Sequence, residues 1–251
     1  AMTSEKIARM PVTIDGVTRP YGQGGLEMLR QNSATQAPVG VFCGSLIGHI
    51  RDFVGVENLA YLAVDDEPLL DEMIQTVADN AYEGVKMVLE AGARFDYGHF
   101  WEDICYRSGP LVSPRFFAEK IGPQYRRITG LLHKHGIELA SVDCDGCIDA
   151  LIPTWLENGV NIMNPVEVGT WGASIGPWRA KYGRALRAIG GVDKRIFAQD
   201  RAAVDREIER LRPLVDAGGY LPCPDHSIPP DAEWDLVSYY CQRMREVFSR
   251  G

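Results

Sequence analysis

The chain has 251 residues, of which 45% are hydrophobic and 24% are charged, proportions that suit one globular domain of the size of a single α/β barrel. Its net charge of −8 and isoelectric point near 5.2 exclude most binders of nucleic acid or of anionic membranes, because phosphates would be repelled over much of the surface. No apolar stretch reaches the roughly 18 to 20 residues of a membrane helix, and the N-terminus lacks a signal-peptide pattern, so we expect a cytoplasmic protein that acts on a small molecule or binds another protein.

The first 37 residues read as an N-terminal extension. The run from Thr13 to Thr18 surrounds an Asp-Gly pair, which is typical of a tight β-hairpin. It does not resemble a strand followed by a helix. We therefore divide the chain into an extension, residues 1–37, and a barrel domain, residues 38–251.

Beyond residue 38, short apolar runs alternate with longer amphipathic segments, the order typical of parallel strands with covering helices. The predicted strands are Val39–Phe42, Ala93–Tyr97, Glu138–Val142, Val160–Met163, Ala188–Gly190 and Tyr220–Pro222. The predicted helices are Pro68–Glu90, Pro114 to about Lys134, Ala202–Val215 and Pro230–Ser249. This order predicts an α/β fold of the TIM-type (β/α)8 barrel class. Six strands are two fewer than such a barrel has, so the chain is a short variant, a fragment, or a barrel completed by another chain.

The carboxyl ends of the strands are where a parallel barrel gathers its reactive groups. The third strand leads into Asp143-Cys144-Asp145-Gly146-Cys147, and alternation along a strand places Asp143 and Asp145 on the same side. Two adjacent carboxylates can bind a divalent metal or share a proton. The alternative is that Asp145 or Asp149 caps the next helix.

The last strand leads into Cys223-Pro-Asp-His226, a rigid loop whose CxxH spacing suits a zinc ligand pair. His226 can act as a general acid, a metal ligand or an anion clamp, or it can simply bond Asp225 to shape the loop. The CxxC spacing of Cys144 and Cys147 is a weaker signal by itself. Our candidate metal ligands are Asp143, Asp145, His226 and Cys223.

Acidic and aromatic residues follow the second and fourth strands. Trp101 is followed by Glu102 and Asp103, and a carboxyl group beside a Trp in a cleft tends to have a raised pKa; alternatively, Trp101 closes the barrel and Asp103 is a cap. We take Asp143, Asp145, His226 and Glu102 as candidate catalytic residues. The candidate substrate-binding residues are Trp101, Asp103, Asn164, Glu167 and Tyr97.

Several of these segments resemble one known superfamily. Trp101-Glu102-Asp103, then Gly109-Pro110-Leu111-Val112-Ser113-Pro114, is similar to a stretch that precedes a long helix in the uroporphyrinogen decarboxylase and corrinoid methyltransferase superfamily, and the likeness runs from about Pro38 to Arg250. The resemblance implies a TIM barrel and an enzyme. It also implies that Asp143, Asp145 and His226 stand where methylcobamide:coenzyme M methyltransferase-like relatives hold zinc through His and Cys.

The resemblance leaves three functions open. The first is a corrinoid-linked methyltransferase or demethylase that acts on a small methylated substrate, with zinc or another divalent metal, and with a corrinoid carried by a partner protein. The second is a metal-free decarboxylase, in which Asp143 or Asp145 stabilises a developing cation and Arg51, Arg107 or Arg195 holds a carboxylate. The Arg-rich N-terminal segment of true uroporphyrinogen decarboxylases is missing, which argues against a porphyrinogen. The third is a non-catalytic subunit that completes or scaffolds a second chain. We expect a homo-oligomer or hetero-oligomer.

Overall fold

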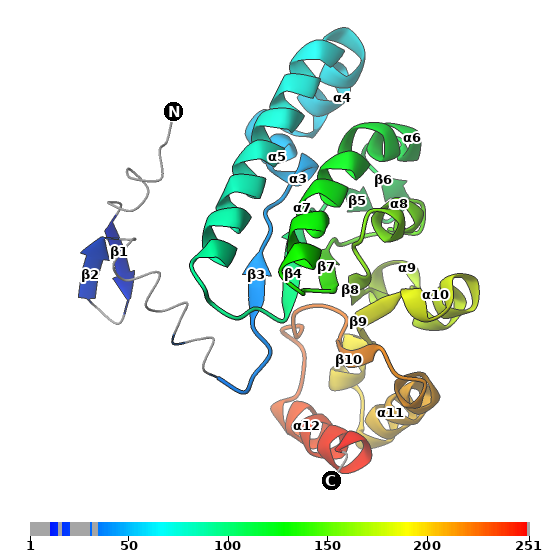
Figure 1. Ribbon diagram of the computed structural model, residues 1–251. Coiled ribbons are helices and arrows are strands. Elements are labelled where there is room, and N and C mark those ends of the chain that lie inside the picture. The colour runs from blue at the N-terminus through cyan, green and yellow to red at the C-terminus, as the bar shows by residue number, and fades with distance from the viewer. Residues whose placement is uncertain (1–10, 15–16, 21–30, 32–34, 250–251) are drawn as a thin grey trace.

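The structure, a computed structural model, describes residues 11–14, 17–20, 31 and 35–249. Its central feature is one parallel sheet in which the strand order follows the chain order (Figure 1). The six strands are β3 (Gly40–Phe42), β4 (Tyr97–Trp101), β7 (Leu139–Asp143), β8 (Ile162–Val166), β9 (Arg187–Val192) and β10 (Tyr220–Pro224). β3 and β10 are the two edge strands. The predicted α/β fold with a parallel sheet is therefore confirmed.

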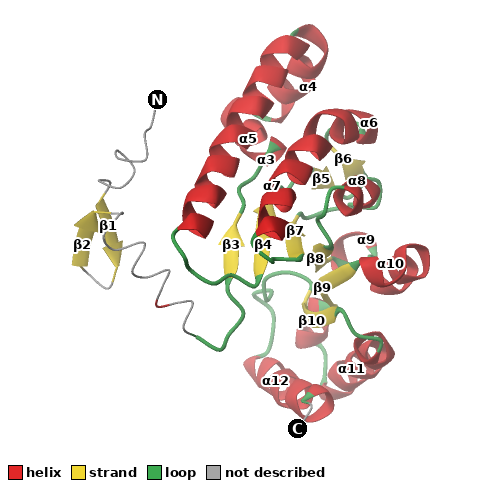
Figure 2. Cartoon of the chain, viewed as in Figure 1, coloured by secondary structure: helices red, strands yellow, loops and turns green. Residues whose placement is uncertain are grey.

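Helices surround the curved sheet, and most of them lie along its outer side (Figure 2). They are α3 (Ile47–Val54), α4 (Val56–Asp65), α5 (Glu67–Glu90), α6 (Pro114–Phe116), α7 (Gly122–Lys134), α8 (Ile152–Glu157), α9 (Val168–Trp171), α10 (Ile175–Tyr182), α11 (Arg201–Asp216) and α12 (Trp234–Phe248), with a π-helical turn at Phe117–Ile121 and 3-10 turns at Gly183–Ala185 and Lys194–Ala198. Within the described ranges, none of the helices combines the length and the apolar character needed to cross a bilayer.

The predicted N-terminal hairpin is confirmed. β1 (Pro11–Ile14) and β2 (Val17–Pro20) pair antiparallel, with Ile14 opposite Val17. The Asp-Gly pair that prompted the prediction lies outside the described residues. A short second hairpin, β5 (Cys105–Tyr106) with β6 (Gly109–Pro110), follows β4.

The prediction for β4 was wrong by four residues, because the predicted strand ends where the observed one begins. Gly98 reads as a strand terminator in the sequence, yet it lies inside β4. A Cβ at Gly98 would come within 2.4 Å of Leu132 on α7, so glycine is needed there to let the helix pack closely against the strand. This shift places Trp101, and not Tyr97, at the carboxyl end of β4.

The hydrophobic core lies between the sheet and the helices. Phe100 points outward from β4 and meets Tyr125 of α7 edge-on at 4.9 Å between ring centroids. Phe117 meets Trp155 of α8 in the same way at 5.6 Å. All four rings are fully buried, and burial of this much apolar area fixes the helices against the strands. The side chains on the other side of each strand are left to form the site.

Candidate functional site

The strand ends converge on a polar pocket of about 320 Å³. Its lining comes from the ends of β4, β7 and β8 and from the loop after β10, and comprises Trp101, Asp103, Asp143, Asp145, Asn164, Pro165, Pro224, His226 and Ser227. Residues from four strand ends therefore meet in one place, as expected for the mouth of a parallel barrel.

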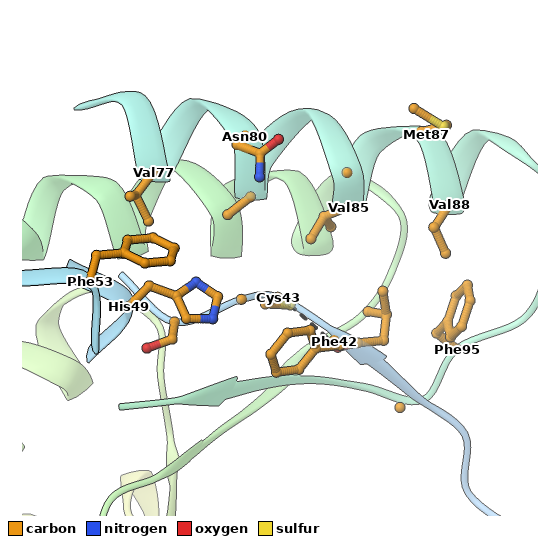
Figure 3. A pocket seen from close by; sticks show the side chains of 16 residues that line it. Phe42, Cys43, His49, Phe53, Val77, Asn80, Val85, Met87, Val88 and Phe95 are labelled. Carbon is orange, nitrogen blue, oxygen red and sulfur yellow. Dashed lines mark hydrogen bonds between the residues drawn. The ribbon is translucent and has the colours of Figure 1, made fainter. Parts of the chain in front are cut away.

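A second hollow, of about 550 Å³, lies between β3 and α5 (Figure 3). Val77 and Val88 project from α5 toward the segment that carries Phe42 and His49 (Figure 3). Its lining is mainly apolar, and burial raises the pKa of the Cys43 thiol there to about 12, which keeps that thiol protonated and unreactive at neutral pH. The larger hollow thus lacks a cluster of reactive groups, and the strand-end pocket is the candidate site.

Three carboxylates crowd together in the strand-end pocket. Oxygen atoms of Asp103, Asp143 and Asp145 lie within 4.8 Å of one another. Burial, and then the nearby charges of Asp103 and Asp145, raise the pKa of Asp143 to about 6. Burial and the charge of Asp103 also raise the pKa of Asp145. Such a cluster favours either a bound cation or a retained proton, because the negative charges cannot all be solvated.

Two polar side chains contact this carboxylate cluster. Nε2 of His226 lies 3.4 Å from Oδ2 of Asp145, an ion pair whenever the imidazole is protonated. Nδ2 of Asn164 donates to Oδ2 of Asp143 at 2.6 Å. His226, from the loop after β10, therefore contacts Asp145, and Asn164, from β8, contacts Asp143 at the end of β7.

The loop after β7 is held from two sides. The backbone N–H of Asp145 donates to Oδ1 of Asp103 at 3.0 Å. The N–H of Gly146 donates to the carboxylate of Glu167. Gly146 has φ +87, and a Cβ there would meet the carbonyl of Cys105 at 2.5 Å, so this turn requires glycine.

The loop after β10 is held by Asp225, which is only 1% exposed. Its carboxylate accepts from the N–H of Gly169 at 2.7 Å and from the N–H of Lys194 at 3.3 Å. These bonds tie the loops after β8, β9 and β10 together. Asp225 is thus occupied by backbone groups, and His226 faces Asp145 instead of its sequence neighbour.

The structure brings together six of the residues singled out in the sequence: Asp143, Asp145, His226, Trp101, Asp103 and Asn164. Pro165, Pro224 and Ser227 also line the pocket, and no chemical signal in the sequence singled them out. The expectation that Asp145 or Asp149 caps the next helix was wrong. No side chain caps the N-terminus of α8, and Asp149 accepts a hydrogen bond from the indole of Trp178.

Glu102 does not line the pocket, contrary to the role that we expected for it. It follows Trp101 directly, and alternation turns it away from the site. Its fully buried carboxylate accepts from the N–H groups of Leu46 and Gly48, at 2.9 and 2.8 Å, and from the hydroxyl of Tyr125. Burial raises the pKa of Glu102, although these hydrogen bonds oppose the shift.

Three further expectations need correction. Glu167 is 4% exposed, and its carboxylate accepts hydrogen bonds from the N–H of Gly146 and the hydroxyl of Thr170. It therefore stabilises the loop after β7 and does not line the pocket. Tyr97 lies at the amino end of β4, opposite Gly40, far along the strand from Trp101. Cys223 is outside the pocket lining, and burial raises the pKa of its thiol.

The CxxC thiols are placed away from the carboxylates. Cys144 is buried, and its hydrogen bond with Cys105, together with burial, raises its thiol pKa. Burial also raises the pKa of Cys147. Within the described ranges, Asp103, Asp143 and Asp145 are the one group of three or more potential ligands that lie close enough to share an ion. Neither Cys144 nor Cys147 therefore belongs to the acidic cluster.

The parallel strands and the polar site at their carboxyl ends define an α/β protein of the TIM-barrel type. The chain belongs to the uroporphyrinogen decarboxylase (URO-D) family, whose model matches residues 1–247. The family and the two solved structures compared below are TIM-barrel proteins, which confirms the predicted fold class.

Two solved structures are similar to this chain. A methyltransferase from Methanosarcina mazei has a TM-score of 0.68 and 15% identity over 92% of this chain and 66% of its own. A putative vitamin-B12-independent methionine synthase from Listeria monocytogenes has a TM-score of 0.53 and 13% identity over 90% of this chain and 70% of its own. No curated protein matches the sequence at a significant level. The chain thus spans about two thirds of the Methanosarcina protein, and at these identities the likeness concerns the fold.

Proposed function

We propose that this protein is a methyltransferase or demethylase that takes a methyl group from a small methylated substrate, with a divalent cation in the strand-end pocket and a corrinoid, carried by a partner protein, as methyl acceptor. The observation that carries the proposal is the convergence of Asp103, Asp143 and Asp145 within 4.8 Å, with His226 beside Asp145. The two similar structures are a methyltransferase and a putative vitamin-B12-independent methionine synthase, which supports methyl transfer as the reaction class. The corrinoid acceptor rests on the family resemblance of the sequence alone.

The donor set fits a divalent cation. The three carboxylates are ligands that zinc accepts, and an oxygen-only set also suits harder ions such as magnesium or manganese. Burial, and then repulsion from neighbouring carboxylates, raise the pKa values of Asp143 and Asp145, and His226 offsets these shifts only in part. A bound cation would supply the missing positive charge. Thiols do not contribute, so the site differs from one that activates a thiol through zinc. When bound, the cation would polarise the heteroatom that carries the methyl group.

The chain's own residues have separate tasks. Asn164 holds Asp143 by a hydrogen bond, which fixes the direction of the remaining carboxylate oxygen. His226 can keep a proton on Nε2 beside Asp145 and deliver it to the heteroatom that loses its methyl group. Trp101 gives the pocket an apolar wall for the methyl group. A volume of about 320 Å³ is at the lower end for ligand pockets, which favours a small substrate.

The charges of the pocket argue against the decarboxylase alternative. Its lining contains no Lys or Arg among the described residues, so a carboxylated substrate would meet three acids. Arg51 is paired with Asp52 and Arg195 with Asp193. Arg107 is exposed and is not part of the lining. A neutral or cationic methyl donor suits this pocket better than an anionic substrate.

The test is methyl transfer to free cob(I)alamin from a panel of small O-methyl and N-methyl compounds, followed by the absorbance of methylcobalamin. We expect transfer from at least one donor after loading with Zn²⁺ or Mn²⁺, and loss of transfer after chelation or in Asp143→Asn. The control variant Glu72→Gln changes an exposed acid in the middle of α5 and should behave like the wild type. Zinc-loaded and manganese-loaded proteins that transfer no methyl group from any donor would overturn the proposal.

A further inference from the structure

We infer that Arg51, which lies outside the pocket lining, is a positioning residue that holds Asp103 in the orientation in which its carboxylate joins the acidic cluster. The inference rests on the proposed cation site and extends it to α3, which contributes no residue to the lining of the strand-end pocket. Its first support is a direct contact, because Nη1 of Arg51 donates to the backbone carbonyl of Asp103.

Arg51 contacts both residues that flank Glu102. Besides the bond to Asp103, its guanidinium carbon lies 5.7 Å from the ring centroid of Trp101, within the range of a cation–π contact. The Arg51 side chain is only 16% exposed, so its position is largely fixed by these neighbours. The Arg51 side chain thus fixes the turn that follows β4, where Trp101 and Asp103 enter the pocket lining.

The backbone of Asp103 is strained. Its φ of +47 is the one positive value among the non-glycine residues of the described part of the chain. An L-residue in the left-handed region persists only where its surroundings hold it there, and such residues cluster at functional sites. Asp103 is held at two atoms: its carbonyl by Arg51 and its Oδ1 by the N–H of Asp145. Loss of either bond should let the residue relax toward ordinary backbone angles.

Helix α3 is itself anchored by the residue next to Asp103. The Glu102 carboxylate accepts from the N–H groups of Leu46 and Gly48 at the N-terminus of α3, where a negative charge is favoured. A Cβ at Gly48 would come within 2.2 Å of the carbonyl oxygen of Glu102, so the close approach requires glycine. Glu102 therefore fixes the start of α3, and Arg51, one turn further on, reaches back to Asp103.

The charge of Arg51 is already balanced. Its Nε and Nη2 donate to Oδ1 of Asp52 at 3.2 and 2.8 Å. Arg51 is therefore neither the counter-ion of the acidic cluster nor an open site for a substrate carboxylate. Arg51 therefore acts on the site by positioning its neighbours, through the hydrogen bond that it donates to Asp103 and its contact with Trp101.

The test compares Arg51→Met, which keeps the chain length and loses every donor, with Arg51→Lys, which keeps one charged donor group. Two quantities are measured: the hydrogen-exchange rate of the Asp145 amide in the cation-free protein, and the Kd for Zn²⁺ by calorimetry. We expect exchange to accelerate at least about tenfold and the Kd to weaken by roughly 10- to 100-fold in Arg51→Met, the usual range for residues that orient a metal ligand. Arg51→Lys should recover most of both losses.

The matched control is Arg179→Met. Arg179 also donates to backbone carbonyls, those of Gly218 and Gly219, at 2.8 and 3.2 Å, but in a different loop. The Arg179→Met variant should leave both readouts at their wild-type values.

An Arg51→Met protein with wild-type exchange of the Asp145 amide would overturn the inference. If the wild type bound no Zn²⁺, the proposed function would fail, whereas the exchange rate would still decide the role of Arg51. If Arg51→Met did not fold, Arg51→Gln, whose side chain is too short to reach the carbonyl of Asp103, would take its place, and wild-type exchange of the Asp145 amide in Arg51→Gln would overturn the inference.

Discussion

Nε2 of His226 lies 3.4 Å from a carboxylate oxygen of Asp145. The two residues are 81 positions apart in the sequence (226 − 145), and β8 and β9 separate their strands in the sheet. Their contact therefore spans the mouth of the barrel. It joins the one imidazole of the pocket lining to the acidic cluster, and the proposed function uses it for proton delivery.

Replacing His226 by Gln should slow methyl transfer by about 10² to 10⁴-fold, the usual contribution of a positioned proton donor. The reduction should be smallest for methyl donors whose leaving heteroatom is a weak base, because these need a proton least. The measurement is the single-turnover rate with a graded series of donors. His133→Gln changes an exposed residue on α7 and serves as the control. Equal slowing across the whole series would contradict a role in proton delivery.

The affinity for a divalent cation should depend on pH through Asp143. Its pKa is raised to about 6, so protons compete with the cation below that pH. The Kd for Zn²⁺ should weaken by up to about tenfold per pH unit below pH 6 and change little above about pH 7. Calorimetric titrations at several pH values measure this. In Asp143→Asn the binding should be weak throughout, and a wild-type Kd that is constant from about pH 5 to 7.5 would count against the cluster as the cation site.

The same cluster should destabilise the cation-free fold at neutral pH. The folded-state pKa of Asp143 is raised from the ordinary value of 3.8 to about 6, so ionisation above pH 6 disfavours the folded state, and the penalty disappears below pH 3.8, where the group is protonated in both states. Asp143→Asn should therefore raise the midpoint of urea unfolding at about pH 7.5, and the gain should shrink toward about pH 4. The opposite sign would show that Asp143 is stabilised by charges other than those described.

Glu102 should matter for stability and not for the chemistry directly. Glu102→Ala leaves the N–H groups of Leu46 and Gly48 and the Tyr125 hydroxyl without their buried acceptor, at a cost of about 3 to 5 kcal/mol in the free energy of unfolding. Glu102→Gln keeps one acceptor oxygen and should cost about 1 to 3 kcal/mol. Glu72→Gln should stay within about 0.5 kcal/mol of the wild type. Urea unfolding provides the comparison, and a wild-type midpoint for Glu102→Ala would refute the anchoring role.

Two glycines should respond to alanine in opposite ways. Gly146→Ala places a Cβ 2.5 Å from the carbonyl of Cys105 at a left-handed φ, so it should destabilise the protein by more than about 1 kcal/mol and weaken cation binding. Gly130 lies inside α7 with open space around its Cβ position. Gly130→Ala should stabilise by about 0.4 to 1 kcal/mol. Thermal unfolding distinguishes the two, and similar shifts for both variants would contradict the requirement for a glycine at 146.

Much of the fold could be predicted because apolar runs and amphipathic segments alternate clearly along the chain. Among the six strands, β4 was displaced furthest, since a glycine often ends a strand, whereas Gly98 lies inside β4 and makes room for Leu132. That requirement comes from tertiary packing, which one sequence does not reveal. The shift also explains why, of the two aromatic residues expected at the site, Trp101 lines it and Tyr97 does not. The shorter helices α3, α4, α8, α9 and α10 were not predicted.

The site could be predicted where it depended on a single strand, because successive side chains of a strand point to opposite faces of the sheet. Asp143 and Asp145 share a side because they are two residues apart at the end of a strand. Glu102 and Asp103 are adjacent and equally acidic, and only the strand register decides that the first is buried against α3 while the second faces the pocket. The contact between Arg51 and Asp103 depends on the placement of α3, for which the sequence carried no signal.

The most direct test of the cation site is an anomalous difference map from crystals soaked in Zn²⁺. The account predicts one strong peak in the strand-end pocket, at about 2.0 to 2.2 Å from oxygens of Asp103, Asp143 and Asp145. The peak should be absent from Asp143→Asn crystals treated in the same way. A pocket without a peak, or a zinc ion bound at Cys144, Cys147 or Cys223 instead, would contradict the account.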